Sequence, residues 1–153
     1  MKKIILVAAM VLGFAVAASA QPRAVGIRGT YGGAEISYQH SLGTNFLEGN
    51  LGLAGNGLNV AATYNYMIAQ PEWTSKGEWG FYAGPGAAVG LGLGQFSYLN
   101  LAVTGQVGLE YTFWFPLQLS LDLRPQLGIA MVGELSSMYF GGWYPSLGVR
   151  YKF

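Results

Sequence analysis

The sequence predicts an all-β fold, an eight-stranded antiparallel up-and-down barrel, from its composition and its periodicity. Charged residues make up only 10% of the 153 residues, where about 25% is usual for a soluble domain. Beyond residue 20, no uninterrupted apolar run approaches the roughly 20 residues that a membrane helix needs. Low charge without long apolar runs indicates alternation of apolar and polar residues, which is the period of a β-strand.

The first 20 residues, MKKIILVAAMVLGFAVAASA, are expected to form a cleaved secretory signal peptide. Lys2 and Lys3 provide a basic start, and the apolar run from Ile4 to Val16 is too short to span a bilayer comfortably. Ala18-Ser19-Ala20 has the A-x-A form of a cleavage site. An N-terminal membrane anchor is the alternative interpretation. We therefore expect one barrel domain over residues 21–153.

The first five expected strands alternate weakly and are defined mainly by the turn residues between them. Gly32-Gly33, SLGTN at 41–45 and AGNG at 54–57 are typical turn sequences, and AQPEWTSKGE at 69–78 is a longer connection. These breaks place strands at about 24–32, 34–41, 46–54, 58–68 and 79–90.

The last three expected strands alternate more clearly, at about 101–113, 117–129 and 143–153. From Leu117 to Ile129, every odd position but one is Leu or Ile, and the even positions are polar or glycine. A strand separates these two sets onto opposite faces, whereas a helix would mix them. Residues 131–142 are expected to be a connection. Three prolines fall inside expected strands and predict irregularities nearby: Pro85, Pro125 and Pro145.

Alternation alone does not show which face of the barrel is apolar. A lipocalin-like soluble barrel has apolar residues inside, whereas a membrane barrel has them outside, with aromatic belts and a polar lumen. The polar faces of this chain carry few charges for a surface in contact with water, and its aromatic residues gather towards both ends of the strands. The expected signal peptide excludes a cytoplasmic location. These features favour a transmembrane β-barrel.

The end of the sequence, LGVRYKF, resembles the C-terminal signal of bacterial outer-membrane barrels, with apolar residues at alternate positions before a terminal Phe. Leu147, Val149, Tyr151 and Phe153 carry this resemblance. The stretches GAEISYQHSLG, EWGFYAGPGAAVGLG and GLEYTFWFPLQLSLDLRP also resemble small OmpA/OmpX-type barrels. The resemblance implies a bacterial outer-membrane location, periplasmic termini and assembly by the barrel-assembly machinery. It also implies that outer-membrane lipid and lipopolysaccharide surround the barrel.

Strand parity places both signs of charge in the barrel interior. Balanced charges in a narrow lumen can pair, so we expect an ion-pair plug and a structural or envelope-interface role. Glu110, Asp122, Arg124 and Arg150 are expected to meet on the last three strands. The alternatives are a narrow pore or a lipid- or small-molecule-handling barrel, including a lipid-modifying enzyme. The expected lumen residues are Arg28, Glu35, Glu48, Glu110, Asp122, Arg124 and Arg150, with Lys152 at the rim.

No catalytic, metal or cofactor site is predicted. His40 beside Ser41 resembles a base and a nucleophile, but it lies at the periplasmic end of its strand, away from the outer leaflet where lipid A-modifying barrels act. The glycine-rich run at 84–94 lacks the GK[ST] ending of a phosphate-binding loop. No basic patch indicates nucleic acid, because residues 21–153 hold six basic and seven acidic residues.

Overall fold

The structure, a computed structural model, describes residue 4 and residues 22–54, 57–92 and 97–153. Nearly all of the expected signal peptide, and its boundary at residue 21, lie outside these residues. No helix in the described part of the chain is long and apolar enough to cross a membrane. The strands are β1 (Pro22–Thr30), β2 (Gly33–Leu42), β3 (Asn45–Ala54), β4 (Gly57–Ala69), β5 (Glu78–Gly92), β6 (Tyr98–Thr112), β7 (Leu117–Leu123), β8 (Gln126–Val132), β9 (Leu135–Gly141) and β10 (Ser146–Lys152).

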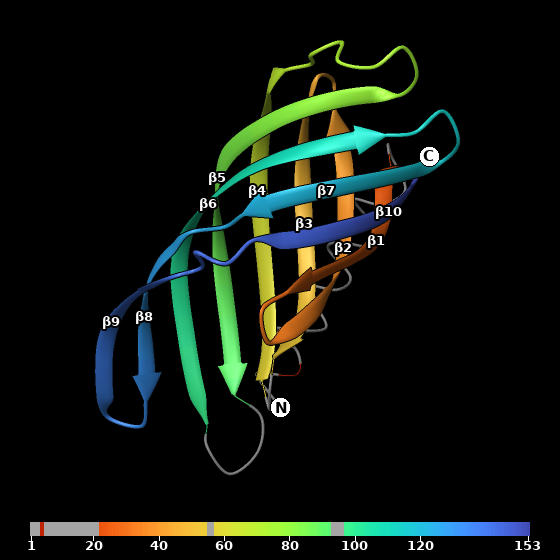
Figure 1. Cartoon of the computed structure of the whole chain (residues 1–153). Coiled ribbons are helices and arrows are strands. Elements are labelled where there is room, and N and C mark those ends of the chain that lie inside the picture. The colour runs from red at the N-terminus through yellow and green to blue at the C-terminus, as the bar shows by residue number, and fades with distance from the viewer. Residues whose placement is uncertain (1–3, 5–21, 55–56, 93–96) are drawn as a thin grey trace.

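Eight of these strands close into an antiparallel barrel, in the order β1-β2-β3-β4-β5-β6-β7-β10 (Figure 1). The β5–β6 pairing joins the two arms of the sheet, and β1 pairs with β10 to complete the ring, with Ile27 opposite Val149. Short glycine-containing turns connect the first strands, as at Gly32 and Gly43, which have positive φ angles. The predicted eight-stranded antiparallel barrel is confirmed.

The strand predicted over residues 117–129 is wrong as a single strand. It is divided at Arg124-Pro125 into β7, which pairs with residues 107–112 of β6, and β8, which pairs with residues 98–104 of the same strand. Proline has no amide hydrogen, so it cannot continue the donor pattern of the ladder. Its carbonyl instead accepts a hydrogen bond from the Gly105 amide at 3.0 Å.

The connection predicted at 131–142 is also wrong, because these residues complete the hairpin of β8 and β9. Gly133, with a φ of 61°, forms the hairpin turn, and β9 pairs with β8. These two strands lie outside the closed barrel and extend the sheet beside β6 (Figure 1). In the described ladders, no strand pairs with the outer edge of β9. The last barrel strand, β10, starts at Ser146, after Pro145, instead of at residue 143.

Pro85 is the one of the three prolines that remains within a strand. Thr63 pairs with Gly86 and Tyr66 with Ala83, but the two positions between them lack ladder pairs, so the β4–β5 ladder is interrupted where the proline has no N–H. The described ladders shift register elsewhere, between Pro22 and Ala24 in β1 and between Met67 and Ala69 in β4.

The inner face of the barrel is polar and the outer face is apolar. On β7, Ser120 and Asp122 are buried, whereas Leu119 and Leu121 are 39% and 50% exposed. The same division runs through the other barrel strands, and 17 polar or charged residues among those described are buried inside the barrel. Exposed apolar residues on the outside include Ile27, Ile36, Leu53, Phe81, Leu101, Val103, Val107, Leu147 and Val149.

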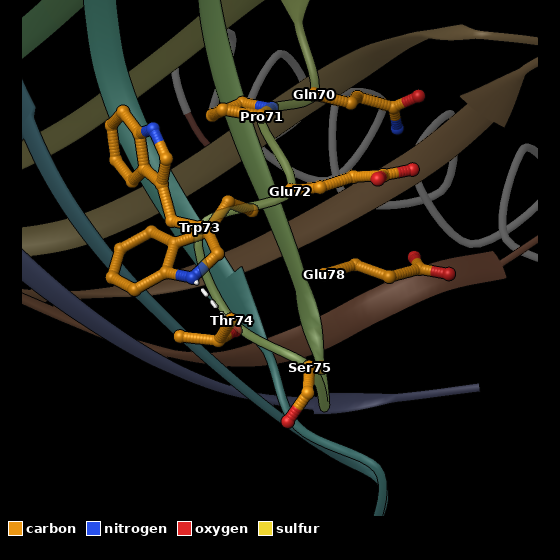
Figure 2. A pocket seen from close by; sticks show the side chains of 9 residues that line it. Gln70, Pro71, Glu72, Trp73, Thr74, Ser75 and Glu78 are labelled. Carbon is orange, nitrogen blue, oxygen red and sulfur yellow. Dashed lines mark hydrogen bonds between the residues drawn. The ribbon is translucent and has the colours of Figure 1, made fainter.

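Aromatic side chains gather at both ends of the barrel. At the end that carries Phe153, called here the Phe153 end, the Trp79 ring lies 4.8 Å from Tyr111, and Tyr151 lies 5.3 Å from Phe153. The β4–β5 connection forms a hollow of about 610 Å³ at this end, and Figure 2 shows side chains that line it. Trp79 Nε1 donates to Thr74 Oγ1 at 3.1 Å.

The opposite end, called here the far end, has a smaller aromatic group. Tyr31 stacks on Tyr144 at 4.7 Å, and Phe140 lies 5.0 Å from Trp143. Tyr98 and Tyr139, at the same end, line a cavity.

Candidate functional site

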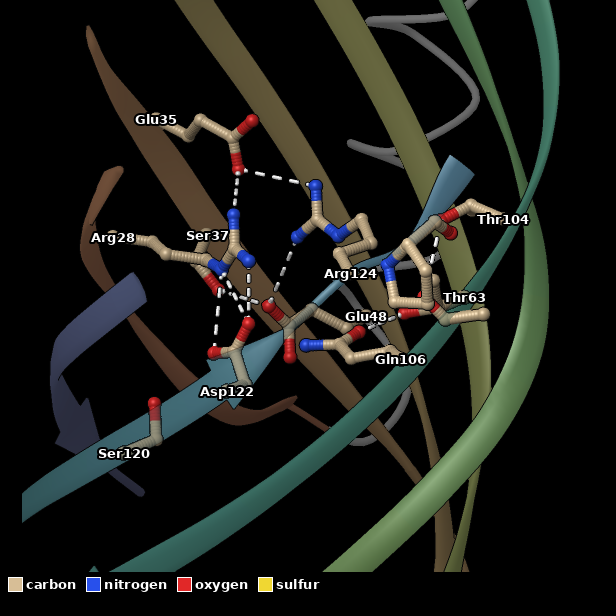
Figure 3. Close-up of polar contacts among 12 residues, drawn as sticks. Arg28, Glu35, Ser37, Glu48, Thr63, Thr104, Gln106, Ser120, Asp122 and Arg124 are labelled. Atoms are coloured by element: carbon tan, nitrogen blue, oxygen red, sulfur yellow. Dashed lines mark hydrogen bonds and ion pairs between the residues drawn. The ribbon is translucent and has the colours of Figure 1, made fainter. Parts of the chain in front are cut away.

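A network of buried ion pairs fills the middle of the barrel, as the balanced charges predict (Figure 3). Arg28, on β1, bonds Asp122 through its Nε at 3.0 Å and through Nη2, and its Nη1 donates to Glu35 Oε2 at 2.9 Å. Glu35 Oε2 also accepts from Arg124 Nη1 at 3.2 Å. The result is a continuous chain, Asp122–Arg28–Glu35–Arg124, across the interior.

Glu48 on β3 is the centre of a second group. Its Oε1 accepts from Arg150 Nη2 at 2.9 Å and from Ser37 Oγ at 3.1 Å, and its Oε2 accepts from Gln39 Nε2 at 3.0 Å. Each of the three Arg150 nitrogens has a partner, because Nε also donates to Ser37 at 2.8 Å and Nη1 to Ser120 at 2.6 Å. A charge buried this deeply is tolerated only when its hydrogen-bonding capacity is used in this way.

A third group lies nearer the Phe153 end and is centred on Glu110. Both of its oxygens accept from the Arg23 guanidinium, and Gln118 Nε2 donates to it at 3.2 Å. Arg23 also donates to Gln39 Oε1 at 2.5 Å, and its Cζ lies 4.1 Å from the centre of the Phe46 ring. This cation–π contact holds the guanidinium across the part of the interior nearer the Phe153 end.

Arg23 was not among the residues expected in the lumen. Simple alternation from Arg28 predicts that Arg23 faces outward, because the two positions differ by five, an odd number. The register shift between Pro22 and Ala24 is a bulge, and a bulge adds one residue and reverses the parity beyond it. A bulge at the first residues of a strand leaves no pattern in the sequence by which it could be predicted.

The structure places all seven expected lumen residues inside, each at most 6% exposed and each in a salt bridge. The expected meeting of Glu110, Asp122, Arg124 and Arg150 is wrong, because they are distributed over the three groups. In the ladder Glu110 faces Ser120, and Arg150 faces Gln118. The barrel is narrow enough for side chains to meet across it, so these residues bond to β1, β2 and β3.

Some buried side-chain atoms in the described interior have no hydrogen-bond partner. They include Nδ2 and Oδ1 of Asn50, Nε2 of Gln106, and Nε and Nη2 of Arg124. Arg124 Nη2 lies 4.0 Å from Glu48 Oε1, within ion-pair range but beyond hydrogen-bond distance. Buried polar groups normally bind protein or ordered water, so these atoms favour the alternative of a hydrated path through the lumen.

Two hollows open from the interior at the two ends of the barrel. At the Phe153 end, a hollow of about 520 Å³ is lined by Arg23, Ser41 and Lys152, so Lys152 lies at the rim as expected. At the far end, a cavity of about 220 Å³ is lined by β4, β5, β6, β8 and β9. The lining of the far-end cavity is uncharged.

His40 and Ser41 do not form a nucleophile and base pair. As neighbours on β2 they point to opposite faces. His40 Nδ1 lies 3.4 Å from the Tyr38 hydroxyl on the outer face, whereas Ser41 donates to the Gly43 carbonyl at 3.4 Å and lines the hollow at the Phe153 end. Among the described residues, no group of His, Asp or Glu has the arrangement of a metal site.

The residues that resemble an outer-membrane C-terminal signal lie along one face of β10. Leu147, Val149 and Tyr151 point outward and are more than half exposed, and the Phe153 amide donates to the Arg23 carbonyl at 3.1 Å. β10 therefore forms the seam with β1 through its backbone and presents its apolar side chains to the exterior.

No family model, curated protein or solved structure matches this chain.

Proposed function

We propose that this chain is an integral barrel of the bacterial outer membrane, exported by residues 1–20, with a structural or envelope-interface role. One observation carries the proposal: the barrel is polar inside and apolar outside. A soluble barrel with a ligand inside has the opposite arrangement, because its outer face must be hydrated. An exterior of Leu, Ile, Val and aromatic side chains is stable only against another apolar phase.

Strand lengths and aromatic positions support the same proposal. A membrane-crossing strand needs about 9–11 residues. The six barrel strands β1 to β6 have 9, 10, 10, 13, 15 and 15 residues, whereas β7 and β10 have seven each. Trp and Tyr prefer the interface between lipid and water, where the ring is partly buried and its polar atom is hydrated. Aromatic groups at the two ends of the barrel, with aliphatic residues between them, fit an apolar band bounded by two interfaces.

The interior supports a closed structural barrel as the first candidate. Arg150, Tyr82, Phe46, Gln39 and Gln118 are fully buried across the lumen, and the ion pairs described above join opposite walls. We propose that outer-membrane lipid and lipopolysaccharide surround this barrel and that the assembly machinery reads Leu147, Val149, Tyr151 and Phe153. The proposed role includes no catalytic step.

The test of the membrane assignment is folding of residues 21–153 from urea into detergent micelles or lipid vesicles. A membrane barrel is expected to give a β-rich species that runs at a different gel position before and after heating, because the folded barrel resists the detergent of the gel. A monodisperse, folded protein in buffer without any amphiphile would overturn the proposal in favour of a soluble barrel.

A narrow pore is the second candidate, favoured by the unpartnered atoms of Asn50, Gln106 and Arg124. Planar-bilayer conductance of the refolded barrel distinguishes the two candidates. The plugged barrel is expected to give no discrete channels. Stepwise currents whose size changes in Arg124→Ala would instead support a conducting pore over the plugged barrel.

A further inference from the structure

We propose that the far-end cavity binds a single neutral, hydroxyl-rich ring, such as a pyranose sugar. This inference goes beyond the structural role proposed above, and it holds whether the barrel lies in a membrane or in water. It rests on three features of the cavity: small residues in its wall, Ala88 and Gly90, a set of uncharged polar groups that line it, and its volume of about 220 Å³.

The cavity lies beside a transverse row of small residues in the sheet, of which Ala88 is part of the cavity lining. Ala61 pairs with Ala88, Ala88 with Ala102, and Ala102 with Gly128, so four successive strands present no side chain larger than a methyl group. Tyr139, the partner of Gly128, ends the row and packs against the three alanines. A Cβ at residue 128 would lie 2.5 Å from the Leu101 carbonyl oxygen, 2.8 Å from Ala102 Cβ and 2.9 Å from the Tyr139 ring, so this glycine allows both the strand pairing and the ring.

The next row towards the far end supplies polar groups with a space between them. Asn59 and Asn100 both pair with Gly90, which has no side chain to separate them. The Asn59 amide donates to Glu35 Oε1 at 3.5 Å, which fixes one edge of the cavity to the ion-pair network. Asn100 lines the cavity, and its Oδ1 is buried without a hydrogen-bond partner among the described residues, so a rotation of the side chain would present this acceptor to a ligand.

The chemistry of the lining selects the class of ligand. Its polar side chains are three amides, Asn59, Asn100 and Gln126, and two phenols, Tyr98 and Tyr139. Amides donate and accept hydrogen bonds, as sugar hydroxyls do, and tyrosine rings pack against the C–H faces of a ring while their hydroxyls bond its edge. An ionised ligand would be buried here without a counter-ion in the lining, which is costly.

The size of the cavity limits the ligand to one ring. A volume of 220 Å³ corresponds to about seven water molecules at roughly 30 Å³ each, and it lies below the roughly 300–1,000 Å³ of sites for drug-sized ligands. A free glycoside and the sugar head group of a glycolipid share the chemistry that this site recognises.

The experiment is saturation-transfer difference NMR on the barrel refolded in lauryldimethylamine oxide, a detergent without a sugar head group. The probes are methyl glucopyranoside and methyl glucuronide, which share a ring but differ by one carboxylate. Saturation transfer to the ring protons of the neutral glycoside is expected, with binding of the glucuronide weaker by about tenfold or more. Equal transfer to both probes, or none to either, would overturn the proposal.

Two matched pairs of variants locate the binding. Ala88→Leu fills the row of small residues and should abolish transfer, whereas Ala87→Leu adds the same atoms on the exposed outer face and should preserve it. Asn100→Ala removes the buried acceptor without adding volume and should weaken binding by about tenfold, whereas outward-facing Leu101→Ala should not. The gel shift on heating shows that each variant is folded. If the sugar still binds to both Ala88→Leu and Asn100→Ala, it binds outside the far-end cavity, and the proposal is overturned.

The source of the sugar is tested by reconstitution in phosphatidylcholine vesicles with and without a monoglucosyl diacylglycerol. Competition between the glycolipid and the free methyl glucoside indicates that a head group enters the cavity from the membrane. Transfer to the free glycoside that the glycolipid leaves unchanged indicates a soluble ligand. Failure of membrane insertion would overturn the proposed function, whereas the micelle experiment tests the binding site by itself.

Discussion

At the scale of single residues, Arg28 shows how the interior is stabilised. It bonds both Asp122 and Glu35, and all three side chains are buried. Removing one partner leaves the other charge buried and unpaired, which typically costs about 3–5 kcal/mol. We predict that Arg28→Ala and Asp122→Ala each destabilise the barrel by roughly this amount in urea unfolding. The double variant should lose less free energy of unfolding than the two single variants added together, and the difference should be on the order of 0.5–3 kcal/mol.

Two comparisons control this cycle. Leu121→Ala on the outer face of β7 leaves no buried charge and should cost less than either single variant. The pair Asp122→Ala and Arg124→Ala should couple more weakly than the first pair, because these residues connect only through Arg28 and Glu35. Additive effects of Arg28→Ala and Asp122→Ala would indicate a wet interior in which the ion pair contributes little.

Parity in the sequence predicts that all seven lumen charges face inward, but it does not predict their partners. Alternation depends only on the position of a residue along its own strand, whereas partners depend on which strands face each other across the barrel. Glu110 and Arg150 show the difference: each is inward by parity, yet they bond Arg23 and Glu48, on strands near the start of the chain. Arg23 shows a second limit, since a bulge reverses its parity.

At the scale of elements, the junction between β9 and β10 depends on one glycine. Gly142 has a φ of 80°, and a Cβ there would meet the backbone carbonyl of Arg124. We predict that Gly142→Ala lowers the free energy of unfolding. The left-handed conformation of a non-glycine residue should cost roughly 1–2 kcal/mol, and the steric overlap a further 1–3 kcal/mol. Urea unfolding followed by tryptophan fluorescence measures the loss.

Gly133 is the matched control, because it has a φ of 61° in the β8–β9 turn and nothing lies within 4 Å of its Cβ position. Gly133→Ala should therefore show the conformational cost alone. Equal losses in the two variants would mean that the β9–β10 junction does not pack against Arg124 and Pro125 as described.

The elements were predictable where alternation was regular and unpredictable where one strand divides. Residues 117–129 keep their alternation through Pro125, so the pattern by itself predicts one strand. The division at Pro125 and the start of β10 after Pro145 both follow from the missing proline amide. Pro85 has the same chemistry but remains in β5, because the β4–β5 ladder is interrupted at its position while its pairing with Gly105 of β6 continues. Proline thus predicts an irregularity without predicting its form.

At the scale of the whole molecule, ring closure depends on the pairing of β1 with β10. The seam runs from Gly29–Leu147 to Ala24–Lys152, and Phe153 adds one bond, from its amide to the Arg23 carbonyl. Its side chain is 62% exposed and lies against Tyr151. Phe153 therefore contributes little to the closed barrel, whereas the proposed function gives it a part in assembly.

We predict that deletion of Phe153 reduces insertion into the outer membrane of cells. In vitro, the deletion should lower the free energy of unfolding by only about 0.5–1.5 kcal/mol, the contribution of one hydrogen bond. Phe153→Ala retains the backbone bond, so it should match the deletion in cells but unfold like the native barrel in urea. Phe115→Ala removes an exposed aromatic ring at the same end and should insert normally. The measurements are the yield of heat-modifiable barrel in outer-membrane fractions and the urea midpoint. Normal insertion of both Phe153 variants would remove the assembly role assigned to this strand.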